Sequence, residues 1–277
     1  MASRRLREML ALTATVVGRE VRPARRAVRV VARALGPIRE LDVAELVWHE
    51  TDPPGRWVPI VVTRLDRRAA DDRRRLIPGM RRVIDRVRSG RLDDGLALVI
   101  AALGPPRVEA PLVAGLAGRV RRRARDLVRT LEAAGTVYAV EPLHDVRIAT
   151  KKLRYAVELV RDLTDLPVSR VLRRLKQQQD LLGRLHDLQV VQERLQAVAA
   201  GANVSRAIRH ACDAADATLE LDCRALHGRF VRGVPRLVEL CEQVRTQVAP
   251  RLVPPRGRRM TAGRTATSVA AAAGGEA

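Results

Sequence analysis

The segment HDVRIATKKLRYAVELV, residues 144–160, carries the clearest periodic signal in this 277-residue chain. Polar side chains recur every three or four positions, at His144, Arg147, Lys151 and Arg154, so they form one stripe along a helix. Apolar residues fill the adjacent positions and can enter a core. The pattern predicts an amphipathic helix whose charged face is an almost unbroken run of cations headed by a histidine.

The composition limits the class of partner. Lys and Arg number 52 against 31 Asp and Glu, a formal net charge of +21, and so large an excess favours a polyanion. Hydrophobic residues make up 47% of the chain, which is enough for a core, but only two Trp, two Tyr and one Phe are present. Because bases of single strands stack on aromatic side chains, a ligand with phosphates and no bases fits better than nucleic acid.

Cysteine and hydropathy patterns point to an intracellular protein without cofactors. Cys212, Cys223 and Cys241 form no CxxC pair, which is typical of buried thiols in a reducing compartment and predicts no zinc site. No apolar run approaches the roughly 18 residues of a membrane span. The arginine pair and apolar stretch within residues 1–20 are similar to a twin-arginine export signal, but the repeat described next favours an ordinary helix. We expect a cytoplasmic location with no metal or other cofactor.

Two parts of the chain match when the sequence is shifted by 147 residues. ASRRLREMLAL (2–12) aligns with ATKKLRYAVEL (149–159), and LGPIRELDV (35–43) aligns with LGRLHDLQV (182–190) without a gap. An ungapped match of this length predicts an internal duplication.

Helical periodicity extends through most of the chain. Proline and glycine pairs such as Gly36-Pro37 and Pro78-Gly79 predict helix ends, and WVPIVV (57–62) is the one run with ambiguous strand character. We therefore predict an all-α fold of two homologous halves. The predicted helices are 2–17, 22–34, 38–50, 57–75, 80–89, 93–103, 111–134, 143–163, 168–182, 184–199, 204–229 and 233–248.

Cations also recur on the second predicted helix of each half. A charged helix face is usually a solvated surface, but like charges at i, i+4 destabilise a helix by about 0.2–0.5 kcal/mol per pair. Because they recur at matched places, we expect an external anion to neutralise them. The first half has Arg22, Arg25, Arg26, Arg29 and Arg33 on one face, and the second has a cluster of Arg170, Arg173, Arg174, Lys176 and Gln177.

The HxxRxxxKKLRY run (144–155), followed by LLGRLHDLQV (181–190), resembles the CHAD family, the conserved histidine α-helical domain. The segments RRLREML and LGPIRELDV of the first half resemble the family's other copy. This resemblance implies two helical bundles, related by a pseudo-twofold axis, around a basic groove that binds inorganic polyphosphate without known catalysis. It implies ligand-binding roles for His144, Arg147, Lys151, Lys152, Arg154, Arg4, Arg5 and Arg7.

With the resemblance, the duplication predicts two domains and a tail. The first bundle is predicted at 1–110 and the second at 111–248, while 249–277, rich in Pro, Gly, Arg and Ala, is predicted to be a disordered tail. The counterparts of the first histidine and arginine of the stripe would precede Met1. We therefore expect the first bundle to be truncated at its N-terminus.

Together, the resemblance and the second-helix cations predict one polyphosphate site. Lys151 and Arg154 are expected to face away from the core side of their helix, so that replacing them leaves the fold intact. His144 follows Pro142 closely and also fits a helix cap; a cap and a phosphate ligand are compatible because a helix N-terminus favours anions. The predicted site residues are Arg4, Arg5, Arg7, Arg26, Arg29, Arg33, His144, Arg147, Lys151, Lys152, Arg154, Arg173, Arg174 and Lys176.

Three alternatives stay open. His144-Asp145 and His186-Asp187 look like the HD dyad of metal-dependent phosphohydrolases, and their side chains are plausible metal ligands. In the repeat, however, the second dyad aligns with an Arg-Glu pair of the first half. The ExExK motif of triphosphate-tunnel phosphatases does not occur. Weak nucleic-acid binding by charge alone and attachment to an anionic membrane surface are the other two alternatives.

Overall fold

The computed structural model describes residues 2–50, 57–90, 92–103 and 110–252, with side chains from Arg5 onward. Every regular element within these ranges is helical, which confirms the predicted all-α fold. The elements are α1 (Ala2–Thr13), the 3₁₀ turn η1 (Gly18–Val21), α2 (Arg22–Trp48), α3 (Pro59–Ser89), α4 (Leu92–Leu103), α5 (Ala110–Ala134), α6 (Val140–Leu163), α7 (Ser169–Ala199), α8 (Arg206–Gln243), the π-helical turn η2 (Val244–Val248) and α9 (Ala249–Arg251).

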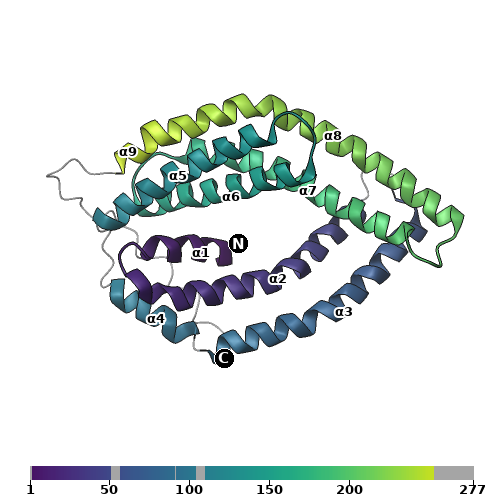
Figure 1. Ribbon diagram of the computed structural model, residues 1–277, viewed down its shortest axis with the longest axis horizontal. Coiled ribbons are helices and arrows are strands. Elements are labelled where there is room, and N and C mark those ends of the chain that lie inside the picture. The colour runs from purple at the N-terminus through teal and green to yellow at the C-terminus, as the bar shows by residue number, and fades with distance from the viewer. Residues whose placement is uncertain (1, 51–56, 91, 104–109, 253–277) are drawn as a thin grey trace, which may run out of the picture.

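The helices form two layers that meet at one end of an elongated molecule (Figure 1). One layer holds α5, α6, α7 and α8, and the other holds α2, α3 and α4. Helix α1 lies between them and contacts α2 on one side and α5 and α6 on the other. This placement puts the N-terminal helix next to the predicted cation stripe of α6.

Several predicted helix breaks are wrong. Helix α2 continues across Pro37, α3 across Pro78 and α7 across Gly183, and α8 continues across the predicted break at 230–232 with Pro235 inside it. Each of the three prolines lies on an exposed side of its helix. Water can therefore bond to the carbonyl that the proline releases. In α2 and α8, buried residues on both sides of the proline also hold the helix in place.

One local ambiguity is resolved and one prediction is corrected. The run 57–62 leads into the predicted helix, and α3 begins at Pro59, because a proline is favoured in the first turn. The first residues of the predicted tail are ordered: α9 is helical, and Ala249 and Leu252 are buried in a core. The rest of that tail, 253–277, lies outside the described residues.

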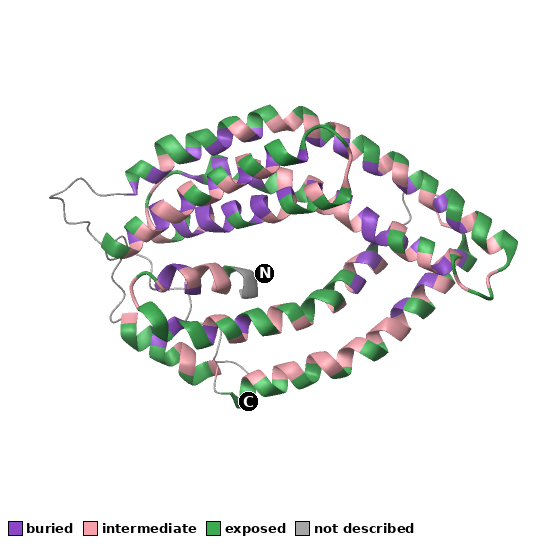
Figure 2. Cartoon of the chain, in the orientation of Figure 1, coloured by how far each residue is buried: buried purple, intermediate pink, exposed green. Residues whose placement is uncertain are grey.

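Three apolar clusters hold the layers together (Figure 2). The largest joins α5, α6, the first half of α7 and the second half of α8, and it reaches Leu12 of α1. A second joins the end of α2 and the start of α3 to the end of α7 and the start of α8. A third packs α1 and η1 against the start of α2 and Val99 of α4. The second cluster thus draws on both sides of the predicted boundary at residue 110, and the duplication itself stays a prediction.

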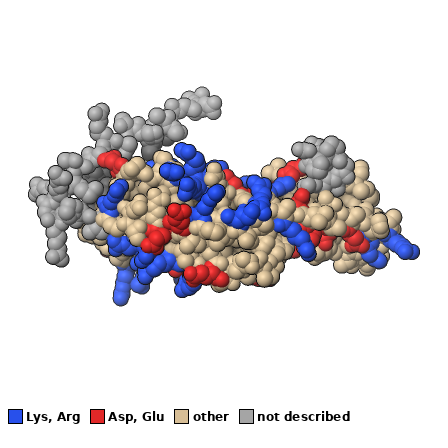
Figure 3. All heavy atoms as spheres, turned by 90° about the horizontal axis from the view of Figure 1, so that it is seen from above, with Lys and Arg blue, Asp and Glu red and all other residues tan. Residues whose placement is uncertain are grey.

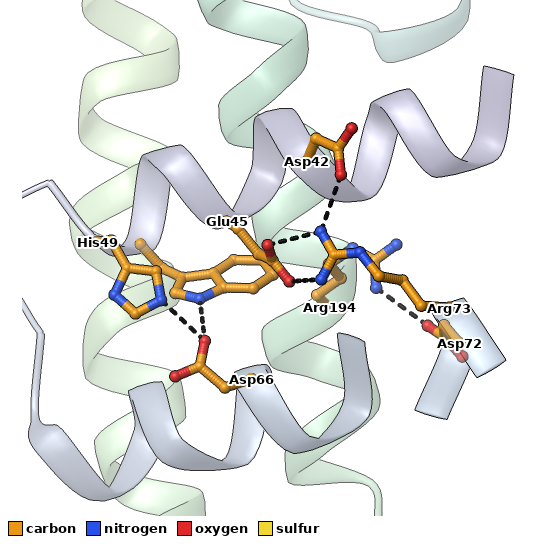
Figure 4. A network of polar contacts seen from close by, with 8 residues as sticks. Asp42, Glu45, His49, Asp66, Asp72, Arg73 and Arg194 are labelled. Carbon is orange, nitrogen blue, oxygen red and sulfur yellow. Dashed lines mark hydrogen bonds and ion pairs between the residues drawn. The ribbon is translucent and has the colours of Figure 1, made fainter. Parts of the chain in front are cut away.

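A polar network reinforces the junction of α2, α3 and α7 (Figure 4). Arg73 of α3 donates to Asp42 at 2.8 Å and to Glu45 at 2.6 Å, both on α2. The same helices are joined where the Trp48 Nε1 donates to Asp66 at 2.9 Å. In this region the arginines are neutralised by carboxylates of the chain itself.

Helix α7 is tied to the first half by two more ion pairs. Arg194 lies 3.2 Å from Asp72 of α3. Arg184 donates to both carboxylate oxygens of Glu50, at 2.6 and 2.5 Å, and Glu50 lies two residues beyond the end of α2. Within the described residues, no helix has the length and apolar character needed to cross a bilayer.

The junction can be tested with two leucines of α8 that lie two positions apart. Leu219 is fully buried in the second cluster, whereas Leu221 is 69% exposed. We expect Leu219→Ala to lower the free energy of unfolding by about 2–5 kcal/mol and Leu221→Ala to change it by less than about 0.5 kcal/mol. Urea unfolding followed by circular dichroism measures both, and equal losses would contradict the packing described here.

Candidate anion-binding site

A cavity of about 400 Å³ opens between α1, α2, α5 and α6. Among the described residues, eight cationic side chains and one carboxylate line it, and we call it the cation pocket. Its lining consists of Arg7, Glu8 and Ala11 of α1, Arg25 and Arg29 of α2, Arg119 and Arg123 of α5, and Arg147, Ile148, Lys151, Lys152 and Tyr155 of α6.

The amphipathic pattern of α6 positions the floor of the pocket. Val146, Leu153, Val157 and Val160 are fully buried in the largest core cluster. This anchoring fixes the rotation of the helix, so that its cation stripe turns toward α1. The same helix therefore supplies both apolar core and charged lining.

Two α6 side chains of the pocket lining are buried although they carry polar groups. Lys151 is only 9% exposed and Tyr155 only 5%. An ammonium group removed from water loses solvation, and a phosphate oxygen beside it would add a favourable charge contact. The guanidinium of Arg154 lies 4.6 Å from the centre of the Tyr155 ring, which adds a cation–π contact below the pocket.

Several donors at the pocket have no acceptor of their own. The Arg7 Nε, the Arg123 Nε and the Tyr155 Oη are buried and have no hydrogen-bond partner within the described part of the chain. Buried polar atoms in native proteins are nearly always bonded to protein, water or ligand. Three such atoms around one cavity indicate a site suited to an anion with several oxygens.

The one carboxylate of the lining already holds two of the cations. Glu8 accepts from the Arg119 Nε at 2.8 Å and also from Arg119 Nη2, and it lies 3.8 Å from Arg123. The pocket therefore contains an anion of the chain itself on its α5 side.

His144 lies in a neighbouring hollow rather than in the cation pocket. This hollow is lined also by Glu141, Asp145, His186 and Glu193, and the two imidazole rings are 5.4 Å apart. Partial loss of hydration lowers the pKa of His144 below its usual value, and His186 and nearby cations lower it further. Helix α6 begins at Val140, so His144 lies one turn inside the helix, and the cap role is not observed.

The His186 ring links this hollow to α2. Its Nε2 lies 3.7 Å from Glu40, and this contact lowers the pKa of the Glu40 carboxyl. Burial raises the pKa of the neighbouring Asp187, although Arg147 opposes that shift. Within the described residues, no group of three or more His, Cys, Asp and Glu side chains is arranged to hold a metal ion.

The family model described as CHAD domain matches residues 1–196. The chain belongs to the CHAD family. CHAD domains are known to bind inorganic polyphosphate and are not typically catalytic. The comparison with curated proteins gave no match. The CHAD match ends within α7, so every helix that lines the cation pocket lies inside it.

The structure brings together only part of the CHAD site predicted above. Arg7, Arg29, Arg147, Lys151 and Lys152 line the cation pocket. Sequence reasoning left three lining arginines out of the predicted site: Arg25, Arg119 and Arg123. Tyr155, which also lines the pocket, was not among the predicted site residues either.

Arg154 departs from its predicted role. It is buried, donates to Gln179 of α7 at 2.7 Å, and forms an ion pair with Glu158 one turn further along α6. Its charge is thus neutralised within the chain. The expectation that Lys151 and Arg154 face away from the core and can be replaced freely is wrong, because both are buried.

The other predicted cations lie outside the cation pocket. Arg5 pairs with Asp162 of α6, and Lys176 pairs with Asp180 one turn away at 2.6 Å. Arg174 lines a separate hollow between α7 and α8 that also contains two glutamates. Arg26, Arg33 and Arg173 are exposed, and the side chain of Arg4 lies outside the described residues.

Positive charge is not confined to the pocket. On the face drawn in Figure 3, Lys and Arg side chains gather over the middle of the molecule, with Asp and Glu side chains among them. The cation pocket differs from this surface by its ratio of eight cations to one carboxylate and by its unbonded buried donors.

The corrected position of Arg154 predicts a stability effect. Replacing it in Arg154→Met leaves Glu158 buried without its cation, which costs about 3 kcal/mol. Lys152→Met, on the exposed side of the same helix, is expected to change the free energy of unfolding by less than about 0.5 kcal/mol. Chemical denaturation of both variants checks this difference, and an Arg154→Met protein as stable as the parent would show that the pair is dispensable.

Proposed function

We propose that this CHAD protein binds inorganic polyphosphate in the cation pocket and does so without catalysis. The observation that carries the proposal is the convergence of eight cationic side chains and one carboxylate on one cavity. Arginine offers a planar fork to two phosphate oxygens, and lysine offers a compact charge. A linear phosphate chain presents the repeated oxygens that such a lining can bind.

The helix arrangement supports a chain rather than a single phosphate. The cations come from four helices, with Arg29 on α2 and Arg119 on α5, and α1 lies between α2 on one side and α5 and α6 on the other. One phosphate group cannot contact all these walls, whereas successive phosphates of a polymer can. Released counterions would then supply much of the binding free energy.

The same features disfavour nucleic acid as the main ligand. Among the described residues of the lining, Tyr155 is the one aromatic residue, and its ring is buried under Arg154. Bases would therefore find no exposed aromatic surface on which to stack. Association with polyphosphate granules in the cytoplasm remains a prediction that follows from this ligand.

Competition between ligands tests the proposal. We expect long polyphosphate to displace single-stranded DNA of equal charge, with an affinity that falls steeply with salt because each neutralised phosphate contributes about −0.7 to the log–log slope. Titrations at several salt concentrations measure both properties. Tighter binding of the DNA at physiological salt would defeat the proposal.

Paired charge reversals locate the ligand in the same experiment. Arg29 and Lys152 are exposed residues of the pocket lining, whereas Arg86 and Arg88 are exposed on α3, away from it. Replacing the first pair by Glu should weaken binding about a hundredfold, and replacing the second pair should weaken it about threefold, since both change net charge equally. Equal losses would show that net charge alone drives binding.

His144 gives the proposed binding a pH dependence. Its depressed pKa in the free protein reflects lost hydration, His186 and the cations Arg147 and Lys151, with Asp145 acting in the opposite direction. A bound polyanion favours the charged imidazole, so the pKa of His144 rises on binding. Binding then takes up a proton, and affinity increases as pH falls from above the bound-state pKa to below the free-state pKa.

The imidazole contribution can be isolated by substitution. In His144→Gln, the rise in polyphosphate affinity between neutral and mildly acidic pH should disappear, while the salt dependence should remain that of the parent. Affinity titrations across this pH range in both proteins measure the effect. Identical pH profiles would show that His144, in its separate hollow, does not sense the ligand.

A further inference from the structure

Glu8 is an unusual member of the cation pocket. Its side chain is only 13% exposed, and it is the one carboxylate among the described lining residues. It accepts from two nitrogens of Arg119 and lies 3.8 Å from Arg123. The free protein thus holds an anion of its own at the α5 wall of the cavity.

This arrangement places Glu8 in competition with a phosphate ligand. The Arg119 nitrogens that a phosphate would use are already bonded to the carboxylate, and a phosphate chain in the cavity would also be repelled by the glutamate charge at short range. Arg123 is held less tightly, since its contacts with Glu8, at 3.8 Å, and with Asp126, at 3.7 Å, are both long and its Nε has no hydrogen-bond partner within the described residues.

We propose that Glu8 is a specificity-determining residue that acts as an internal anion, occupies the α5 wall of the cation pocket and limits the affinity for phosphate chains. This inference rests on the proposed polyphosphate function. A ligand can bind to Arg119 and Arg123 only if it carries enough negative charge to displace the Glu8 carboxylate from them. Glu8 therefore selects multivalent phosphates over single ones.

A purely structural role for Glu8 makes a different prediction. Helix α1 is held by an ion pair on each side: Glu8 with Arg119 of α5, and Arg5 with Asp162 of α6. If Glu8 only docks α1, its removal should loosen the pocket and weaken binding. Asp162 provides a matched control, because it also pairs α1 with a neighbouring helix but does not line the cation pocket.

The experiment compares Glu8→Gln with Asp162→Asn in the full chain. Each substitution removes one carboxylate from an α1 ion pair and raises the net charge by one. We expect Glu8→Gln to bind long polyphosphate about tenfold more tightly at low salt, with a log–log salt slope steeper by about 0.7 because a further phosphate is neutralised. Asp162→Asn should change the affinity less than about twofold. Orthophosphate, used as a competitor, should displace polyphosphate from the parent protein poorly and from Glu8→Gln more readily.

Each outcome decides the matter. Tighter binding by Glu8→Gln alone, with a melting temperature close to that of Asp162→Asn, supports the inference. Weaker binding by Glu8→Gln, or equal gains in both variants, overturns it while leaving polyphosphate binding by the parent in place. A parent protein that does not bind polyphosphate overturns the proposed function and this inference together.

Discussion

Repulsion among like charges is the constraint that the architecture has to satisfy. Eight cationic side chains approach one cavity from four helices, and such groups move apart unless something holds their backbones. The apolar packing behind them does this. Helix α6 buries Leu153 and Val157 in the largest cluster, which also holds Leu12 of α1, and Val28 of α2 lies in the third cluster. The stripe of cations is therefore carried by helices that cannot rotate away from one another.

Elsewhere in the molecule, arginines are neutralised by the chain itself. Arg73 donates hydrogen bonds to two carboxylates of α2, and Arg184 donates to both oxygens of Glu50. At these places the ion pairs join the helices and leave little charge for a ligand. In the cation pocket the numbers of positive and negative side chains do not match, because Glu8 faces eight cations among the described lining residues. The contrast separates arginines that hold the fold together from those available to an anion.

The sequence predicted the features that depend on local periodicity. The stripe of α6 follows from its three- and four-residue spacing, and Lys151 of that stripe lines the cation pocket. The role of Arg154 was missed because its partner Gln179 lies on another helix, and no spacing within α6 reveals that contact. Helix ends were misplaced at Pro37 because a proline on an exposed face costs the helix little more than one hydrogen bond.

The lining arginines of α5 show more clearly what the sequence could not predict. The Arg-rich run of that helix was visible in the sequence, but nothing in it indicates which arginines face α1. Only the packing of α5 against α1 places Arg119 and Arg123 at the cavity and pairs them with Glu8. Likewise, His144 continues the stripe in sequence, yet it lies in the adjacent hollow with His186. The predicted and observed site residues differ because contacts between helices, which are distant in sequence, decide which side chains reach the pocket.

A crystal structure of the protein with bound polyphosphate tests the central claim most directly. We predict a chain of phosphate groups between α1, α2, α5 and α6, with phosphate oxygens in hydrogen-bonding distance of the Lys151 Nζ and the Tyr155 Oη. Phosphates confined to the outer surface of α3, with the cation pocket unchanged, would contradict it.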